Sequence, residues 1–297
     1  MKALTIALAS AVALGQAQAQ LVVTPAWLSS HLNDRNLVLL HVGDRTEARE
    51  QFAKAHIPGA RFVELDDISL SSMNHEDSLM LEMPSPEVLR QKLIALGISD
   101  DSHVVVYPAD DDISPSTRVM LTLDHAGLGA QSSLLDGGLR AWNDAKLATS
   151  ATTVAPKPGK LSALHTKPVI TDVAYVKSRL KAPGFHLIDG RAGAYYDGVR
   201  DGMKPGRRGH VPGAKSIPYT SVTDGKGRLK SADELTRLFA AAGIGAKDTV
   251  VAYCHIGQQA TAVLFAARSL GHPVLLYDGS FQEWGRRTDL PVELPAP

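Results

Sequence analysis

Short apolar runs alternate with amphipathic stretches along most of the chain. Runs such as 104–107 and 249–253 are apolar and prone to β structure, as buried strands are. Stretches such as 85–96 and 231–242 are amphipathic, and each begins at a serine that is expected to act as a helix N-cap. Strands that alternate with helices favour a parallel sheet covered on both faces. The pattern therefore predicts an α/β protein.

The same landmarks occur twice along the chain, in the same order. In each half, an apolar strand ending in charged residues is followed by His-x-Pro-Gly-Ala, at His56 and at His210. Each half closes on Asp-Gly followed by a tryptophan, Trp142 or Trp284. We expect the histidines to hold their loops by hydrogen bonds and the tryptophans to pack in the core. The repeat predicts two α/β domains, each a mostly parallel sheet flanked by helices.

The composition between the two halves indicates where the domains end. A stretch that begins at 150 is rich in small residues, Pro and Lys and has no periodicity, which is typical of a linker. The chain of 297 residues is long enough for two ordinary domains. The predicted organisation is a signal peptide over 1–19, a first domain over 21–149, a linker over 150–167 and a second domain over 168–297.

The first residues have the features of a secretory signal. Lys2 is followed by an apolar run without charge over 4–14, and a small-x-small cleavage site ends at Ala19. The run is short for a bilayer span, which needs about 20 residues. We expect cleavage near Ala19 and an exported mature protein, most simply in a bacterial periplasm.

Charge and cysteine content exclude several function classes. Lys plus Arg and Asp plus Glu both number 31, so the formal net charge is zero and gives no overall attraction to nucleic acid or to an anionic membrane. We therefore expect neither as a partner. The single cysteine, Cys254, excludes an intramolecular disulfide and zinc sites built from several cysteines. Three adjacent carboxylates at 110–112 suggest a solvated loop rather than a metal site.

Cys254 stands between a predicted strand, 249–253, and a stretch of high helix propensity, 261–270. Backbone N–H groups of such a loop and the start of the helix both favour the thiolate over the thiol. A buried structural cysteine is the alternative for a lone Cys, but the strand–loop–helix setting favours a reactive one. The first half has Pro108 at the equivalent position and a longer acidic loop, 109–116. Only the second half therefore carries the nucleophile.

Together, the paired His-x-Pro-Gly-Ala and Asp-Gly-x-x-x-x-Trp motifs and the cysteine loop resemble the rhodanese family. The similarity is to the tandem-domain thiosulfate and 3-mercaptopyruvate sulfurtransferases, over about 21–293. The resemblance implies a rhodanese fold in each half and an inactive N-terminal domain. It implies that Cys254 accepts a sulfane sulfur as a persulfide and passes it to a thiophilic acceptor, cyanide or a thiol. No metal or organic cofactor is needed, because the persulfide is the carrier.

The resemblance also assigns site residues. Arg191 matches the position of the family's substrate-binding arginine, and its fork suits a sulfonate-like or carboxylate group at the pocket mouth; the alternative is a surface or inter-domain salt bridge. Asp189 is expected to orient the loop or Arg191. The loop amides are expected to stabilise the persulfide and bind substrate, over the residues His255, Ile256, Gly257, Gln258 and Gln259.

The loop departs from the better-known members of the family, which leaves the donor open. It lacks the Arg and Lys that follow the cysteine in thiosulfate-preferring loops, and also the Cys-Gly-Ser-Gly-Val of mercaptopyruvate loops. We favour thiosulfate, because Cys-His-x-Gly loops look like those of bacterial thiosulfate sulfurtransferases. 3-Mercaptopyruvate is one alternative, and a periplasmic persulfide carrier that acts on a partner protein is another. A phosphatase or arsenate reductase would need His-Cys-x5-Arg, but Tyr253 and Ala260 occupy the His and Arg positions.

Overall fold

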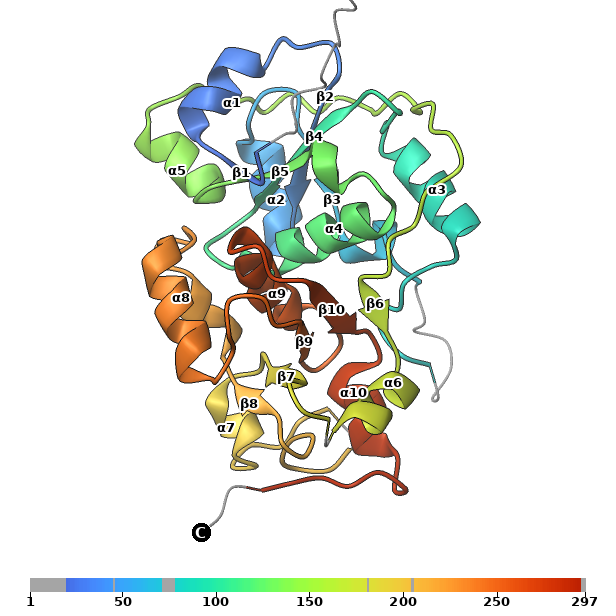
Figure 1. Cartoon of the computed structure of the whole chain (residues 1–297). Helices are drawn as coiled ribbons and strands as arrows, with labels where there is room; N and C mark the ends of the chain where they lie inside the picture. Colours follow the sequence, from blue (N-terminus) through green and yellow to red (C-terminus); the bar gives the residue numbers. More distant parts are fainter. Residues whose placement is uncertain (1–19, 45, 71–77, 181, 204–205, 295–297) are drawn as a thin grey trace, which may run out of the picture.

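The computed structural model describes residues 20–44, 46–70, 78–180, 182–203 and 206–294. Within these residues the chain forms two five-stranded parallel sheets, each with helices on both faces (Figure 1). The predicted signal peptide, 1–19, lies outside the described residues. Among the described helices, none combines the length and the apolar character that a membrane crossing requires.

The first sheet has the strand order β1-β5-β4-β2-β3, and every pair in it is parallel. Its strands are β1 (Val22–Val23), β2 (Leu37–Val42), β3 (Arg61–Val63), β4 (His103–Pro108) and β5 (Ser132–Leu135). The helices of this half are α1 (Pro25–His31), α2 (Thr46–Lys54), α3 (Pro86–Ala95), α4 (Ser114–His125) and α5 (Gly138–Asp144).

The second sheet repeats this order as β6-β10-β9-β7-β8, again with parallel pairs only. Its strands are β6 (Ile170–Thr171), β7 (His186–Asp189), β8 (Lys215–Ser216), β9 (Val250–Tyr253) and β10 (Val274–Tyr277). The helices of this half are α6 (Val173–Arg179), α7 (Gly193–Tyr196), α8 (Ala232–Ala241), α9 (Gln259–Ser269) and α10 (Ser280–Arg286). The predicted α/β fold of two parallel-sheet domains is confirmed.

Alternating side chains of the central strands pack against different helices, which explains why these strands are apolar throughout. In β4, Val104 and Val106 belong to the core that includes residues of α3 and α4, whereas Val105 and Tyr107 pack with residues of α1, α2 and α5. Successive side chains of a strand point to opposite faces, so a sheet covered on both faces needs an unbroken apolar run.

The repeated motifs form the same frame in both halves. The hydroxyl of Tyr107 accepts a hydrogen bond from Ile57 N at 3.2 Å, and that of Tyr253 accepts one from Val211 N at 3.0 Å. The preceding His56 contacts backbone carbonyl oxygens through both ring nitrogens. These contacts confirm that the histidine of the His-x-Pro-Gly-Ala motif holds its loop by hydrogen bonds. Both motif tryptophans, at 142 and 284, are buried as predicted.

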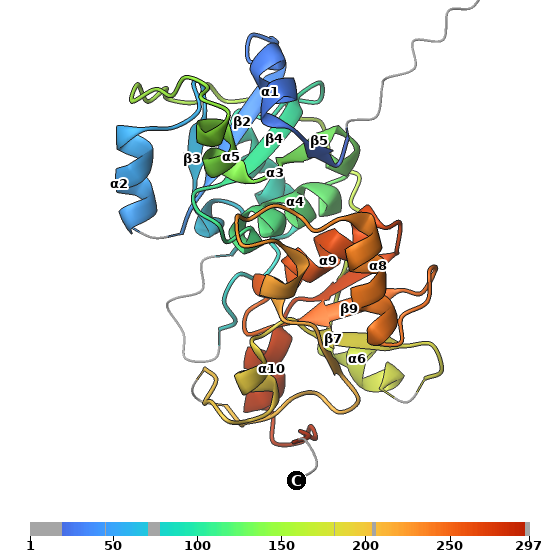
Figure 2. The same cartoon turned by 90° about the vertical axis from the view of Figure 1, so that its left-hand side faces the viewer.

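The two domains meet where α4 lies against α9 (Figure 2). These helices are equivalent, since each follows the strand at the centre of its sheet. Near their N-termini, the hydroxyl oxygens of Thr117 and Thr261 lie 2.8 Å apart across the interface. The prediction of an acidic loop over 109–116 is too long by three residues, because α4 begins at Ser114.

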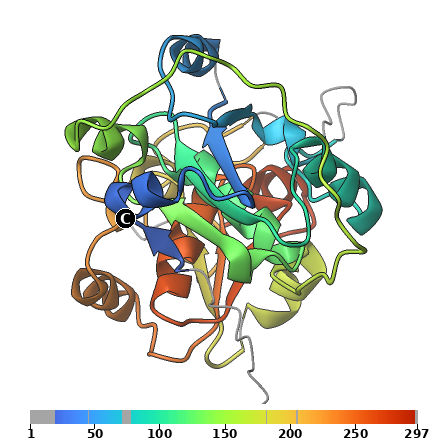
Figure 3. The same ribbon diagram turned by 90° about the horizontal axis from the view of Figure 1, so that it is seen from above.

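Residues 151–169 contain no helix or strand and connect the domains along the surface of the first one. Seen from above, this segment is the yellow-green trace that runs around the N-terminal domain (Figure 3). It is attached to α3, since Gly159 N donates to Ile94 O at 2.8 Å and Arg90 Nε donates to Leu161 O at 2.8 Å. The segment that connects the domains is therefore held against the first domain by hydrogen bonds.

Candidate active site

Cys254 directly follows β9, at the carboxyl end of the second sheet, and is fully buried. Residues 254–258 form a tight loop, and α9 begins at Gln259. The predicted strand–loop–helix setting is confirmed, with the helix starting two residues earlier than expected. Gly257 has φ +79°, a conformation that favours glycine, so the turn depends on that residue.

Three carbonyl groups of this loop are bonded to donors outside it. Phe281 N donates to Cys254 O at 3.0 Å, and Gln282 N donates to His255 O at 3.0 Å. The third, Gly257 O, accepts from Arg118 Nη1 at 3.0 Å.

The N–H groups of residues 255–258, in contrast, have no acceptor among the described residues. The C=O and N–H of a trans peptide point in opposite directions, so the outward carbonyls turn the following N–H groups away from their donors. Successive N–H groups arranged in this way form an anion-binding concavity. The loop is therefore built to hold a thiolate or a persulfide.

His255 contributes no charge to the loop at neutral pH. Burial, and then the nearby cation of Arg191, lower the pKa of His255 to about 4. The imidazole packs edge-on against Tyr195, with ring centroids 4.6 Å apart. Residues 255–259 therefore offer no cationic side chain when His255 is neutral, and an anionic donor needs a cation from elsewhere.

Arg191 does not occupy the pocket mouth, where it was expected, because its side chain is only 1% exposed. Its Nε and Nη2 donate to the Asp189 carboxylate at 2.9 and 2.6 Å, and Nη2 also donates to Gly209 O at 2.7 Å. Burial alone would lower the pKa of Arg191, but the hydrogen bonds and charge of Asp189 outweigh it and raise the pKa. The negative form of Cys254 acts in the same direction. Arg191 is therefore a buried cation close to the cysteine.

An exposed arginine that the sequence reasoning missed, Arg200, is connected to His255 through an aromatic ring. The guanidinium of Arg200 is 5.2 Å from the ring centroid of Tyr195, and that ring in turn contacts His255. The chain then continues past the imidazole at Gly202, where an added Cβ would lie 3.9 Å from the His255 ring. The sequence signal was weak, because Arg200 is 54 positions from the cysteine in a polar stretch without periodicity.

A cavity of about 320 Å³ opens between the loop and the N-terminal domain. Ile256 and Gln258 line it from the loop. The opposite wall combines three carboxylates with apolar side chains and is formed by Asp44, Glu64, Leu65, Asp66, Leu70, Met80 and Leu81. This cavity gives small molecules a place beside the loop.

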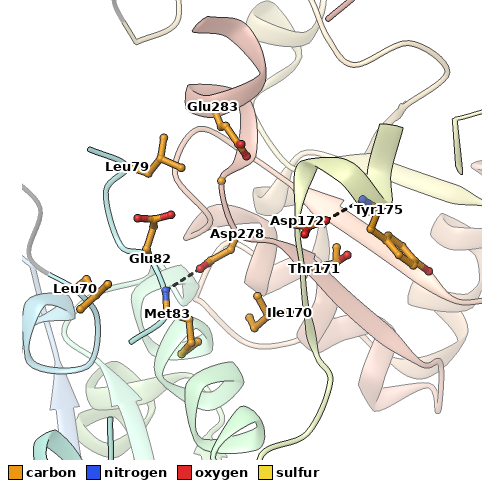
Figure 4. A pocket seen from close by; sticks show the side chains of 11 residues that line it. Leu70, Leu79, Glu82, Met83, Ile170, Thr171, Asp172, Tyr175, Asp278 and Glu283 are labelled. Atoms are coloured by element: carbon orange, nitrogen blue, oxygen red, sulfur yellow. Dashed lines mark hydrogen bonds between the residues drawn. The ribbon is translucent and has the colours of Figure 1, made fainter. Parts of the chain in front are cut away.

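A second cavity, of about 630 Å³, lies elsewhere on the domain interface (Figure 4). Its walls include Glu82, Asp172 and Glu283, and Asp278 Oδ2 accepts a hydrogen bond from Met83 N at 2.7 Å. No residue of the loop 254–259 lines it. Within the described part of the chain, no three His, Cys, Asp or Glu residues are arranged to hold a metal ion.

Comparison with known proteins identifies the family. The model of the rhodanese-like domain matches the chain twice, over residues 24–145 and 172–287. The chain belongs to the rhodanese family.

Relatives of this rhodanese match it over most of its length. The 3-mercaptopyruvate sulfurtransferase of Escherichia coli K12 is 32% identical over 276 residues, which cover 90% of this chain and 95% of the relative. The human protein of the same name is 33% identical over 247 residues, or 81% of this chain and 80% of the relative. The crystal structure of the E. coli enzyme superposes with a TM-score of 0.76 at 28% identity, covering 88% and 99% of the two chains. This rhodanese is a sulfurtransferase with tandem domains, as predicted.

The N-terminal rhodanese domain differs from the second one at the positions that surround Cys254. The strand register pairs His41 with Tyr107, as it pairs Asp189 with Tyr253. Pro108 therefore occupies the position of Cys254. The charged residues that follow the strand in the first half, Asp44 and Arg45, are therefore not the counterparts of Asp189 and Arg191, and Arg45 lies outside the described residues.

His41 and Gly43 take the positions that Asp189 and Arg191 have in the second half. His41 is fully buried among aromatic rings, and burial, followed by the charge of His56, lowers its pKa to about 3. A neutral imidazole thus replaces the carboxylate, and the buried cation is absent. The first half therefore has neither the thiol nor the buried ion pair at these positions.

Proposed function

We propose that this rhodanese moves a sulfane sulfur from an anionic donor to cyanide or a thiol through a persulfide on Cys254. The observation that carries the proposal is the cysteine loop, whose carbonyls face outward and whose N–H groups are free to hold a negatively charged sulfur. The thiolate attacks the donor sulfur, and an S–S bond forms as the donor's bond to that sulfur breaks. Attack by cyanide on the outer sulfur then gives thiocyanate and restores the thiolate.

We infer that 3-mercaptopyruvate is the preferred donor. Its single carboxylate requires one cation, which matches one exposed guanidinium: Arg200 lies over the ring of Tyr195, and that ring packs against a neutral His255. Thiosulfate carries two charges, and the carboxylates across the cavity disfavour a dianion more strongly than a monoanion. In this reaction the C–S bond of the donor breaks, its carbon takes the thiol proton, and pyruvate leaves. The names of the relatives from E. coli and human agree with this choice.

Thiosulfate is the second candidate donor. The loop His255-Ile-Gly-Gln lacks the Gly-Ser-Gly-Val that typically follows the cysteine in mercaptopyruvate enzymes. With thiosulfate, the S–S bond of the donor breaks and sulfite leaves with the bonding electron pair. The amides of the loop serve both donors alike, so the selectivity rests on the cation outside the loop.

Intact-mass measurement tests the proposed function. We expect the reduced protein to gain about 32 Da with 3-mercaptopyruvate, to gain it more slowly with thiosulfate, and to lose it on addition of cyanide. The Cys254→Ser variant should keep its fold and gain nothing. Faster loading from thiosulfate would reverse the choice of donor. Absence of loading from both donors would favour a persulfide carrier that acts on a partner protein.

Arg200→Met tests the donor anchor. We expect KM for 3-mercaptopyruvate to rise about tenfold with little change in kcat, because a charge-assisted contact to the carboxylate is lost. Arg179→Met is a matched control, since Arg179 also lies over a tyrosine ring, at 5.1 Å, but outside the active site. An unchanged KM in Arg200→Met would remove Arg200 from the donor site.

We also propose that the protein works in the periplasm. The support is the charged start, apolar run and small-x-small site within 1–19. The test is the N-terminal mass of protein recovered from a periplasmic fraction, which should begin at Gln20. Retention of residues 1–19 in a cytoplasmic fraction would contradict export.

A further inference from the structure

We propose that Arg118, in the domain without a nucleophile, positions the sulfur-carrying loop of the other domain. Arg118 belongs to α4, is fully buried, and reaches across the domain interface. Its Nη1 donates to Gly257 O at 3.0 Å and to Asp278 Oδ1 at 2.7 Å, and its Nη2 donates to Leu81 O. The inference deepens the proposed function and rests on it only for the sulfur-loading step.

The contact to Gly257 orients the peptide that follows it. The other two outward carbonyls of the loop, those of Cys254 and His255, are held by backbone N–H groups of α10 in the same domain. The carbonyl of Gly257 instead takes its hydrogen bond from the Arg118 side chain. Since the Gln258 N–H points away from that carbonyl, Arg118 fixes the direction in which this amide faces. Removal of Arg118 should let the peptide rotate and weaken the hold on a negative sulfur.

The packing around Gly257 explains why its carbonyl lies so close to Arg118 and why an arginine is needed there. A Cβ added at Gly257 would lie 3.0 Å from Arg118 Nη1 and 3.1 Å from Asp278 O. Asp278 neutralises the buried guanidinium and is itself held by Met83 N at 2.7 Å. The planar fork of arginine serves three acceptors at once, whereas the point charge of lysine does not match this geometry.

Stability alone does not explain this arginine. Its Nε is buried and has no partner among the described residues, and an unpaired buried donor costs free energy. Leu81, whose carbonyl Arg118 holds, also lines the cavity beside Ile256 and Gln258. One side chain thus fixes both the loop and part of the cavity wall that faces it.

The experiment compares how Cys254 reacts with an anionic and a neutral alkylating reagent. Because Cys254 is the single cysteine of the chain, the ratio of its rates with iodoacetate and iodoacetamide reports anion binding by the loop, whatever the natural donor is. The variants are Arg118→Lys and Arg118→Met. Arg140→Met is the control, because Arg140 pairs with Asp111 in the same domain with both side chains 47% exposed.

We expect both Arg118 variants to lower the iodoacetate-to-iodoacetamide ratio about tenfold or more, and single-turnover sulfur loading by a similar factor, with donor KM little changed. Arg140→Met should leave all three unchanged. A drop in Arg118→Met but not in Arg118→Lys would overturn positioning in favour of charge alone. Unchanged ratios in both folded variants would overturn it altogether.

A second variant keeps the test decisive if Arg118→Met does not fold. Gly257→Ala perturbs the same hydrogen bond from the loop side and leaves the interface arginine in place, so it should also lower the ratio. A normal ratio in Gly257→Ala would contradict the proposal. If the wild-type protein shows a high ratio but accepts sulfur from no donor, the proposed function fails while the role of Arg118 stands.

Discussion

Asp189 and Arg191 form an ion pair that water does not reach, with side chains 0% and 1% exposed. Breaking such a pair leaves an unpaired buried charge, so we expect Asp189→Asn to lower the free energy of unfolding by about 3–5 kcal/mol. Asp111→Asn breaks the exposed pair with Arg140 and should cost less than about 1 kcal/mol. Urea denaturation measures both. Equal losses would mean that burial of the pair is unimportant.

Because His41 is buried, we expect the free energy of unfolding to decrease in acid. Its pKa in the folded protein is about 3, well below the ordinary value of 6.5. Between these values the unfolded chain binds a proton that the folded protein rejects, so stability is complete above pH 6.5 and falls as the pH decreases. For His41 alone, the loss at pH 5 should be about 2 kcal/mol.

Denaturation at pH 7 and pH 5 tests this account of His41. The His41→Leu variant should lose less stability over the interval than the wild type, because one proton-binding difference is removed. The matched control, His165→Gln, changes an exposed histidine and should keep the full pH dependence. A wild-type slope in His41→Leu would show that the imidazole is charged in the folded state.

At the scale of single residues, the sequence identified a functional residue when its neighbours along the chain reveal its structural setting. Cys254 was found from its position between a strand and a helix. Arg118 was missed because the loop carbonyl that it holds, Gly257 O, is 139 positions away. Arg200 was missed because it reaches the neighbourhood of His255 only through the ring of Tyr195. Arg191 was found near the cysteine, but its burial could not be predicted, since that depends on the packing of Phe281 and Gly209 around it.

The helices α3 and α8, which occupy equivalent places in the two halves, differ in how their N-termini are capped. Ser231 Oγ accepts a hydrogen bond from Glu234 N, and the Glu234 carboxylate accepts one from Ser231 N, which completes a capping box before α8. Ser85 precedes α3 without a side-chain cap. Both serines take the predicted N-cap position, but only the side chain of Ser231 makes a capping hydrogen bond.

This difference predicts unequal costs of mutation. Ser231→Ala should lower the free energy of unfolding by about 1 kcal/mol, because a cap is lost. Ser85→Ala should change it by less than about 0.5 kcal/mol, as an ordinary surface substitution does. Urea denaturation of the two variants checks the comparison, and similar losses would contradict the assignment of the caps.

Among the elements, the long apolar strands, the amphipathic helices and the helix-prone stretch of α9 were predictable, whereas the short strands and α4 were not. β6 and β8 have two residues each, too few to show any periodicity. α4 is buried from Ser114 to Asp124, so it lacks the polar face by which a helix is recognised. Its burial comes from the second domain, which no local pattern contains.

At the scale of the whole molecule, polar contacts join the two domains closely. Besides Arg118, Gln258 Nε2 donates to Ser114 Oγ at 3.1 Å, and Gln282 Nε2 donates to Met80 O at 3.2 Å. Because these contacts and the helices α4 and α9 are buried together, separating the domains would expose paired polar groups and apolar surface at once. We therefore expect the domains to unfold together.

The tryptophans make cooperative unfolding measurable. Trp142 lies in the first domain and Trp284 in the second, and both are buried. A double variant, Trp27→Phe with Trp142→Phe, leaves Trp284 as the reporter; Trp27→Phe with Trp284→Phe leaves Trp142. Their fluorescence should change at the same urea concentration. Two separate midpoints would show that the domains unfold independently.

The packing around Gly43 also limits what a thiol could do in the N-terminal domain. The substitution Pro108→Cys would place a thiol there, but without the buried ion pair of the second domain. A Cβ at Gly43 would lie 2.6 Å from Ala48 Cβ. An arginine at that position would therefore require α2 to move. Engineering a second reactive cysteine into this chain would take a repacked helix as well as a new residue, so the first domain is better suited to support its neighbour, as Arg118 does.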